Sequence, residues 1–265
     1  MAEMLFSLQG VGFTYGRGID VFRNLNLQVA KGESLCLLGA NGSGKSTLLK
    51  MLCALVFPEE GRLIAFDREI TEQLMENDRF AQNFHRRVGF IFQNSDAQLF
   101  TTRVEDEIAF GPIQLGLSRA EVGKRVDDVI GMLQLEELRE RSPYLLSGGE
   151  KKKVAVASVL VLNPEVLILD EPTNGLDPRT QRWLIDLLLE LNRRGCTIIT
   201  STHNLELAHA LSRRALVLSE QHELIYDGST AEVLANRKLL QEVNLIDEYC
   251  HIHGEREHIH RYVHN

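Results

Sequence analysis

The spacing of apolar and polar residues predicts a chain in which strands alternate with helices. Residues 5–15 and 25–29 alternate between apolar and polar positions, as strands with one buried face do. Largely apolar short runs at 34–38, 88–92 and 166–169 indicate strands that are buried on both faces. Such strands, alternating with helices, predict an α/β fold with a mostly parallel, covered sheet.

Helix-start signals lie between these strands. Ser118 and Ser147 are each followed three positions later by glutamate, the capping-box pattern of a helix N-terminus. Asp177 precedes a proline and predicts the cap of a further helix, which Gly195 ends. The apolar residues after the first of these caps share one helix face: Val122, Val126, Val129 and Leu133.

The remaining elements are less evenly defined. Residues 46–55 predict a helix, residues 197–200 a strand, and residues 215–218 and 224–226 a closing hairpin. Residues 71–87 are polar and favour no single element.

Composition narrows the class of protein. The 265 residues suffice for one large α/β domain with a small appendage. A net charge of −8 argues against a general nucleic-acid-binding surface, and four cysteines without a CxxC pair indicate reduced thiols. The N-terminus has no signal-peptide pattern, and no stretch approaches the ~18 apolar residues of a membrane span. We therefore expect the chain not to cross a membrane.

A phosphate-binding loop lies between the strand at 34–38 and the helix that follows it. The sequence matches the pattern G-x-x-x-x-G-K-[ST] once, at 39–46. The glycines let backbone N–H groups surround phosphate oxygens, Lys45 neutralises their charge, and the Ser46 hydroxyl can ligate Mg²⁺. The residues expected to bind ATP here are Gly39, Ala40, Asn41, Gly42, Ser43, Gly44, Lys45, Ser46 and Thr47.

Two carboxylates end the strand at 166–169. Asp170 suits a magnesium shell, and Glu171 suits polarisation of an attacking water. The alternative is a solvated acidic turn, which the upstream phosphate loop disfavours. His203 and Gln93 also follow strands and can reach the phosphate or Mg²⁺. The alternative for each is an ordinary residue at a strand end or helix start. Tyr15 is a candidate for stacking on adenine or a plain exposed aromatic.

A second anion site precedes the acidic strand. Ser147, Gly148 and Gly149 begin a helix and offer backbone N–H groups of the same kind as the first loop. The helical stretch between the two loops makes it hard for one subunit to bring both to one γ-phosphate. A head-to-tail pair of chains with two-fold symmetry solves this, because the loop of one chain then faces the second site of the other. The alternative is a plain capping box.

Taken in order, these motifs resemble the ATP-binding-cassette ATPases over roughly residues 3 to 235. The resemblance implies an ABC-type P-loop ATPase fold with an antiparallel β subdomain and a helical signature subdomain. It also implies roles: Tyr15 stacks on adenine, Gln93 binds magnesium with Ser46 and Asp170, Asp177 reaches the partner's site, and His203 contacts the γ-phosphate.

The resemblance also predicts domain boundaries. The cassette is expected at 3–238, with the helical subdomain at about 94–160 and a separate C-terminal segment at 239–265. Two positions depart from the family pattern. Glu150 replaces the commoner glutamine of the signature, and lysines fill 151–153 where a mix of residues is usual.

Residues 93–112 resemble the corresponding segment of the ATPase subunits of energy-coupling-factor transporters, particularly those of the cobalt/nickel importer branch. That resemblance implies ATP and Mg²⁺ as cofactors, a second ATPase subunit, a transmembrane scaffold subunit and a substrate-capturing membrane subunit. It implies a peripheral position on the cytoplasmic face of a bacterial or archaeal membrane. Leu99 and Phe100 are expected either to contact the scaffold or to pack in the core.

The last fifteen residues hold five of the nine histidines. Two pairs of them are spaced two positions apart, and neutral imidazoles suit Ni²⁺, Co²⁺ or Zn²⁺. The alternative is a polar tail without a specific role. The candidate ligands are His251, His253, His258 and His260.

The function predicted from the sequence is ATP hydrolysis that powers uptake of cobalt or nickel. Uptake of a vitamin by the same machinery is the first alternative. The others are a soluble cassette ATPase that is not linked to transport, and a metal-binding regulator whose tail is the functional part.

Overall fold

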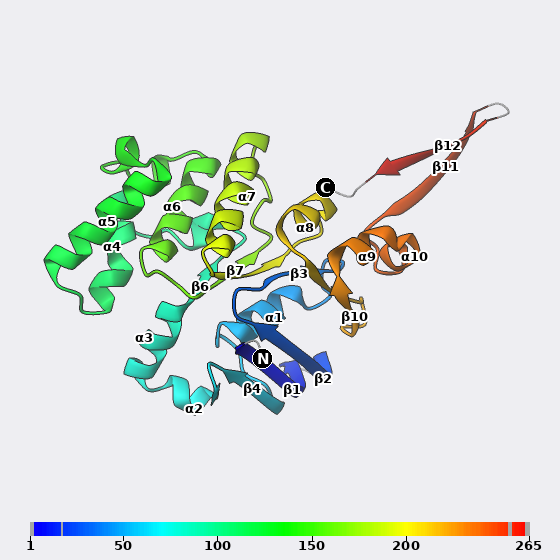
Figure 1. Cartoon of the computed structure of the whole chain (residues 1–265), viewed down its shortest axis with the longest axis horizontal. Helices are drawn as coiled ribbons and strands as arrows, with labels where there is room; N and C mark the ends of the chain where they lie inside the picture. Colours follow the sequence, from blue (N-terminus) through cyan, green and yellow to red (C-terminus); the bar gives the residue numbers. More distant parts are fainter. Residues whose placement is uncertain (1–2, 17, 254–255, 263–265) are drawn as a thin grey trace. The chain divides into compact units, whose positions relative to one another are not determined.

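The structure is a computed structural model that describes residues 3–16, 18–253 and 256–262. For residue 19 and for residues 247–253 and 256–262 it describes the backbone only. The chain divides into two compact units, residues 1–70 with 199–265 and residues 71–198. Figure 1 labels their elements. No helix within the described residues is long and apolar enough to cross a membrane.

The first unit contains the antiparallel sheet that the alternating pattern predicts. Its strands follow the order β2-β1-β4-β5, and the long pair β1 and β2 is joined in antiparallel register. The strands span Met4–Tyr15 (β1), Ile19–Ala30 (β2), Glu60–Ala65 (β4) and Arg68–Glu69 (β5).

A parallel pair in the same unit carries the phosphate loop. β3 (Ser34–Leu38) pairs in parallel with β9 (Arg214–Leu218), which pairs antiparallel with β10 (Leu224–Ser229) and confirms the closing hairpin. β8 (Thr197–Ser201) contains the boundary between the units. The helices are α1 (Lys45–Leu52), α8 (Leu205–Leu211), α9 (Thr230–Ala235) and α10 (Arg237–Glu242).

α1 ends three residues earlier than the sequence predicts. Ala54 adopts a φ of 54°. Its N–H donates to the Met51 carbonyl oxygen, and the N–H of Leu55 donates to the Lys50 carbonyl oxygen. This left-handed stop is usually made by glycine, so the pattern of side chains does not reveal it.

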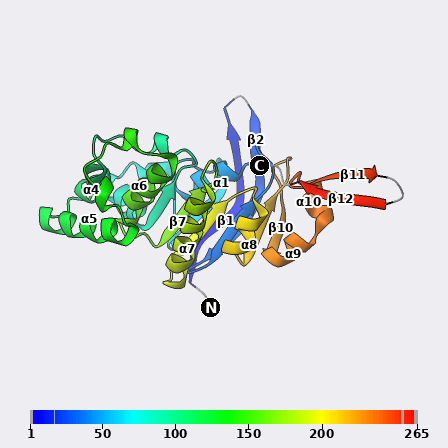
Figure 2. The same cartoon turned by 90° about the horizontal axis from the view of Figure 1, so that it is seen from above.

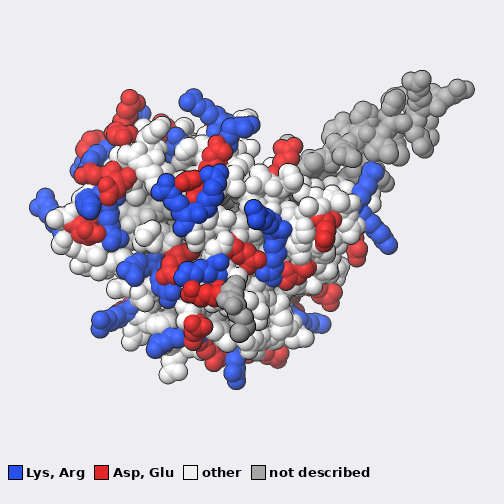
Figure 3. Space-filling view, in the orientation of Figure 1, with Lys and Arg blue, Asp and Glu red and all other residues white. Residues whose placement is uncertain are grey.

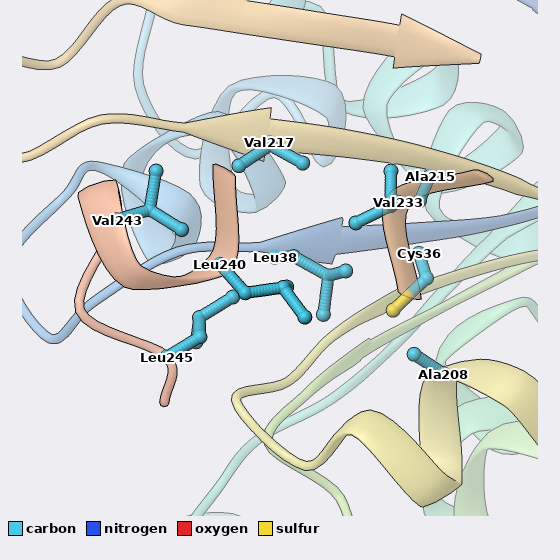
Figure 4. Close-up of a cluster of buried hydrophobic side chains, with 9 residues drawn as sticks. All are labelled: Cys36, Leu38, Ala208, Ala215, Val217, Val233, Leu240, Val243 and Leu245. Carbon is cyan, nitrogen blue, oxygen red and sulfur yellow. The ribbon is translucent and has the colours of Figure 1, made fainter. Parts of the chain in front are cut away.

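Packing in this unit continues beyond residue 239. Leu240, Val243 and Leu245 join a buried cluster with Leu38 and Val217, at most 4% exposed (Figure 4). The first residues of the C-terminal segment therefore belong to the core. Beyond them, β11 (Asp247–His253) pairs antiparallel with β12 (Arg256–Tyr262).

The second unit combines a parallel strand pair with helices. β6 (Val88–Ile91) pairs in parallel with β7 (Val166–Asp170), whose residues are all buried. Helices α4, α5 and α6 lie side by side in both views (Figures 1 and 2). The helices are α2 (Glu72–Met75), α3 (Asp78–Arg87), α4 (Val104–Gln114), α5 (Arg119–Leu133), α6 (Gly148–Leu160) and α7 (Pro178–Arg193), and the 3₁₀ turns are η1 (Ser95–Ala97), η2 (Glu136–Leu138) and η3 (Pro143–Leu145).

The predicted helix caps of this unit are confirmed. Ser118 accepts from the N–H of Glu121, Ser147 forms a full capping box with Glu150, and Asp177 accepts from the N–H groups of Arg179 and Thr180. On the face seen in Figure 3, basic and acidic side chains are intermingled.

Candidate nucleotide site

The loop between β3 and α1 has the backbone shape that phosphate binding requires. Gly39, Gly42 and Gly44 adopt φ values of 151°, 85° and 100°. A Cβ on Gly39 would lie 2.5 Å from the carbonyl oxygen of Leu218, so no larger residue fits. Gly44, at the N-cap of α1, has no side chain that could cap the helix, and helix N-termini of this kind bind anions through their backbone N–H groups.

The polar side chains of the loop fit a polyphosphate. Lys45 is 6% exposed, and its Nζ donates to the carbonyls of Gly39 (2.8 Å) and Ala40 (2.9 Å), which fixes the cation at the loop. Ser43 Oγ is buried without a hydrogen-bond partner among the described residues. Ser46, at the second position of α1, is exposed. These groups match an anion with several oxygens and a cation bound to it.

Two further candidates lie in the same unit. The Tyr15 hydroxyl is 3.3 Å from Thr47 Oγ1 on α1, while its side chain remains 38% exposed. His203 is half-buried between β8 and α8, and the N–H of its neighbour Thr202 donates to Leu37 O on β3 (3.0 Å). The segment that carries His203 is thus tied to the strand that feeds the phosphate loop.

In the second unit the acidic pair ends β7. Asp170 and Glu171 are each 7% exposed, and both have interaction partners. Glu171 adopts a φ of 42°, in the left-handed region that residues with side chains rarely occupy. Strain of this kind is concentrated at functional sites, which favours a chemical role over a solvated turn.

The signature segment begins α6. The Ser147 N–H and Oγ donate to Glu150 Oε2 (2.8 and 2.7 Å), and these bonds hold the pKa of Glu150 below its ordinary value. The Glu150 carboxylate is therefore satisfied by its own helix start. Outside its own helix backbone, no described residue lies within 4 Å of a Cβ built on Gly148, whereas one on Gly149 would meet Thr180 Oγ1 at 2.7 Å.

A family model described as ABC transporter matches residues 22–174, more than half of the chain. The chain belongs to the ABC transporter family. A putative ABC transporter ATP-binding protein of Methanosarcina acetivorans is 47% identical over 95% of this chain and 92% of its own length. The nickel import ATP-binding protein NikO of Rhodobacter capsulatus is 46% identical over 91% and 95%. The energy-coupling factor transporter ATP-binding protein EcfA of Methanococcus maripaludis is 37% identical over 88% and 82%.

Solved structures agree with this assignment. The cbiO1 protein of Clostridium perfringens, described as part of the transporter complex cbiONQ, has a TM-score of 0.79, 32% identity and coverage of 92% of this chain and 95% of its own. A dimeric, post-hydrolysis ATP-binding cassette with ADP and Pi has a TM-score of 0.75 at 27% identity, covering 85% and 99%. The cassette is therefore an ATP-hydrolysing subunit of the energy-coupling-factor type.

The structure distributes the predicted site residues of this cassette between its two units. Tyr15, the phosphate loop, His203 and the four tail histidines belong to the first unit. The second unit holds Gln93, Ser147, Gly148, Gly149, Asp170, Glu171 and Asp177. Within the second unit, Asp177 and Gly149 are neighbours: a Cβ on Gly149 would be 3.5 Å from Asp177 Oδ2. Thr180 donates to that oxygen (2.5 Å), and this bond is the main cause of the lowered pKa of Asp177.

The sequence reasoning missed Lys152 of the cassette. It is 2% exposed, and its Nζ donates to the carbonyl oxygens of Phe92 (3.1 Å) and Gln93 (3.2 Å). Burial lowers the pKa of Lys152 to about 8. A signal was present, because Lys152 falls on the same helical face as Val156 and Leu160, which are buried.

Proposed function

We propose that this cassette hydrolyses ATP to power uptake of Ni²⁺ or Co²⁺ through membrane partner subunits. The observation that carries this proposal is the combination of a phosphate loop with a second anion site at the start of α6. Residues 93–112, which resemble the cobalt/nickel branch of the energy-coupling-factor transporters, point to the substrate. Its similarity to the nickel import ATP-binding protein NikO further supports a metal substrate.

The test of the substrate is uptake by the whole complex. The cassette is reconstituted in vesicles with the membrane proteins that co-purify with it, and accumulation of labelled Ni²⁺, Co²⁺ and vitamins is measured with and without ATP. We expect accumulation of a metal that depends on ATP. Uptake of a vitamin and of neither metal would overturn the metal assignment and retain the transport assignment. No uptake of any of them would favour a soluble ATPase.

We assign the hydrolytic roles as follows. The oxygen of a water molecule forms a bond to the γ-phosphorus as the bond to the ADP oxygen breaks, and Glu171 accepts the proton of that water. His203 holds the γ-phosphate or the water, and Tyr15 stacks on adenine. Ser46, Gln93 and Asp170 supply the oxygen ligands that Mg²⁺ prefers, and the ion, when bound, neutralises charge that develops on the phosphates.

We further propose a head-to-tail homodimer as the working unit. Ser147, Gly148 and Gly149 would contact the nucleotide held by the partner's phosphate loop, and Asp177 would reach across at the same place. The open space at Gly148 supports this, because a phosphate can approach the helix start there. The dimeric post-hydrolysis cassette among the solved relatives also supports it.

The membrane scaffold is proposed to dock on an apolar surface that follows the Gln93 segment. Leu99 is 5% exposed and packs in the core, whereas Phe100 is 56% exposed. Phe110 and Tyr144, which contact Phe100, are exposed as well, and so are Ile113 on the same helix as Phe110 and Leu145 next to Tyr144. Phe100 lies edge-to-face on Phe110, and the Tyr144 hydroxyl donates to Phe100 O. Clustered exposed aromatic residues favour a protein partner, and through it a position at the cytoplasmic membrane face.

The four tail histidines are proposed as a Ni²⁺ or Co²⁺ site, although the side chains of residues 247–265 lie outside the described part of the structure. The backbone register pairs His251 with His258, and Tyr249 with His260. Since residues directly opposite share a face and faces alternate along a strand, His251, His253, His258 and His260 occupy register positions on one face. This juxtaposition supports the proposal.

A further inference from the structure

The first two turns of α6 are attached to residues 92–98, the Gln93 segment, through three different contacts. Lys152 Nζ donates to Phe92 O and Gln93 O, as described above. Lys151 Nζ forms an ion pair with Asp96 at 2.6 Å. Gln98 completes the set, because its Nε2 donates to Ala155 O (3.0 Å) while its Oε1 accepts from the Phe92 N–H (3.3 Å).

Lys152 differs from the other two in its burial. The Lys151 side chain is 20% exposed, and its partner Asp96 is 63% exposed, so solvent screens that pair. Lys152 is almost fully buried, and both of its acceptors are neutral carbonyl groups. Charge-assisted hydrogen bonds in a buried setting are stronger than screened surface pairs, so the Lys152 contact is firmer than the Lys151–Asp96 pair.

The other side of α6 is tied to α7. Lys153 Nζ lies 5.1 Å from the centre of the Trp183 ring, a cation–π contact. Asp177 caps α7, and Thr180 in its first turn lies against Gly149. The signature helix is thus held on one side by the Gln93 segment and on the other by the helix that begins at Asp177.

We propose that Lys152 is a positioning residue that fastens the backbone at Gln93 to the signature helix, so that both move as one body. This proposal rests on the proposed roles of Gln93 and Ser147–Gly149. A displacement at Gln93, from nucleotide on one side or from the scaffold on the other, then reaches the signature mainly through the buried Lys152 ammonium, with the Lys151 and Gln98 contacts beside it. The side chain touches no substrate, and it acts through the Phe92 and Gln93 carbonyls.

The chemistry requires a long side chain with several donors. An ammonium provides three N–H groups, enough for both carbonyls, on a flexible stem. A glutamine at 152 is shorter and uncharged, and a methionine fills the volume without any donor. Arginine retains charge and donors, so Lys152→Arg is the conservative variant.

The test uses the reconstituted complex. We expect Lys152→Met and Lys152→Gln to lower the uptake per ATP hydrolysed by about five-fold or more, a modest coupling factor, with the KM for ATP within about two-fold of wild type. Lys152→Arg should recover most of the loss. Lys124→Met is the control, because Lys124 is exposed on α5 of the same unit, and it should behave as wild type.

A second measurement does not depend on the transported substrate. Hydrogen exchange of residues 92–98 and 147–152 is followed on addition of ATP. In wild type we expect both segments to change protection together; in Lys152→Gln only the first should respond. Unchanged uptake per ATP, or a joint response in Lys152→Gln, would overturn the proposal. Should Lys152→Met fail to fold, the Gln and Arg variants still decide. Failure of the hydrolytic roles would appear separately, as normal turnover in Glu171→Gln.

Discussion

The Thr180 hydroxyl lies where a side chain on Gly149 would have to be. An alanine at 149 would place its methyl carbon 2.7 Å from Thr180 Oγ1, which is too close for a non-bonded contact. The start of α6 therefore approaches the first turn of α7 only because residue 149 is glycine. The second glycine of the signature serves packing within the chain, whereas Gly148 has open space beside it.

Gly149→Ala should push the two helix starts apart. Overpacking of this kind lowers the free energy of unfolding by about 1–3 kcal/mol, and ATPase activity should fall with it. Thr180→Ala in the same chain removes the clash, so the double variant should be more stable than the sum of the single effects predicts. Chemical denaturation of the four proteins measures this. Gly148→Ala is the matched control and should leave stability unchanged, and equal losses at 148 and 149 would contradict the packing account.

Glu150 should make the stability of the cassette depend on pH. Hydrogen bonds from Ser147 lower its pKa below the ordinary value of 4.5. A lowered carboxyl pKa adds stability that is present above the unfolded value and is lost as pH falls through the folded value. Glu150→Gln keeps a capping acceptor without charge. The free-energy difference between wild type and Glu150→Gln should favour wild type at pH 7 and should shrink only below pH 4.5, as the pH falls toward the lowered pKa. A difference that does not vary with pH would contradict the assigned cap.

Leu99 and Phe100 are adjacent and should behave oppositely. Leu99→Ala removes a buried side chain and should lower the free energy of unfolding by about 2–5 kcal/mol. Phe100→Ala loses mainly its contact with Phe110, about 0.5–1.5 kcal/mol, but should weaken co-purification with the membrane subunits. Wild-type recovery of those subunits with Phe100→Ala would contradict the docking surface.

The tail histidines should bind metal in the full chain. Replacing His251, His253, His258 and His260 with alanine should abolish the tightest Ni²⁺ or Co²⁺ binding seen by calorimetry and leave ATPase activity intact. His209→Ala, an exposed histidine on α8, is the matched control. Binding that survives the fourfold change would reject the site. Loss of ATPase activity and transport on removal of the tail would instead favour the regulatory alternative.

Much of the fold could be predicted because its buried strands and capped helices leave a local pattern. β3 follows the apolar run at 34–38, and α5 follows Ser118 and its one-sided apolar face. The helix α3 could not, because Phe84 is its only buried residue. Another helix without a clear pattern, α4, contains a proline at position 112.

The site also contains residues whose role could be predicted from the sequence and residues whose role could not. Phosphate loops and helix caps are contiguous in sequence, so Lys45 and Ser147 could be assigned from their neighbours. The helical face of Lys152 indicates its burial, but its partners could not be predicted, because they are carbonyl groups about sixty residues earlier in the chain. The strain at Glu171 is equally invisible, since it is a property of the backbone and not of the residue type.

The most direct test of the account is the nucleotide-bound state of Glu171→Gln. Loss of a general base lowers hydrolysis by about 10²–10⁴-fold and should leave ATP binding intact. We therefore predict that the purified variant, given Mg²⁺ and ATP, sediments as a dimer that retains two unhydrolysed ATP molecules. A monomeric variant, or one that turns over ATP at the wild-type rate, would contradict the account.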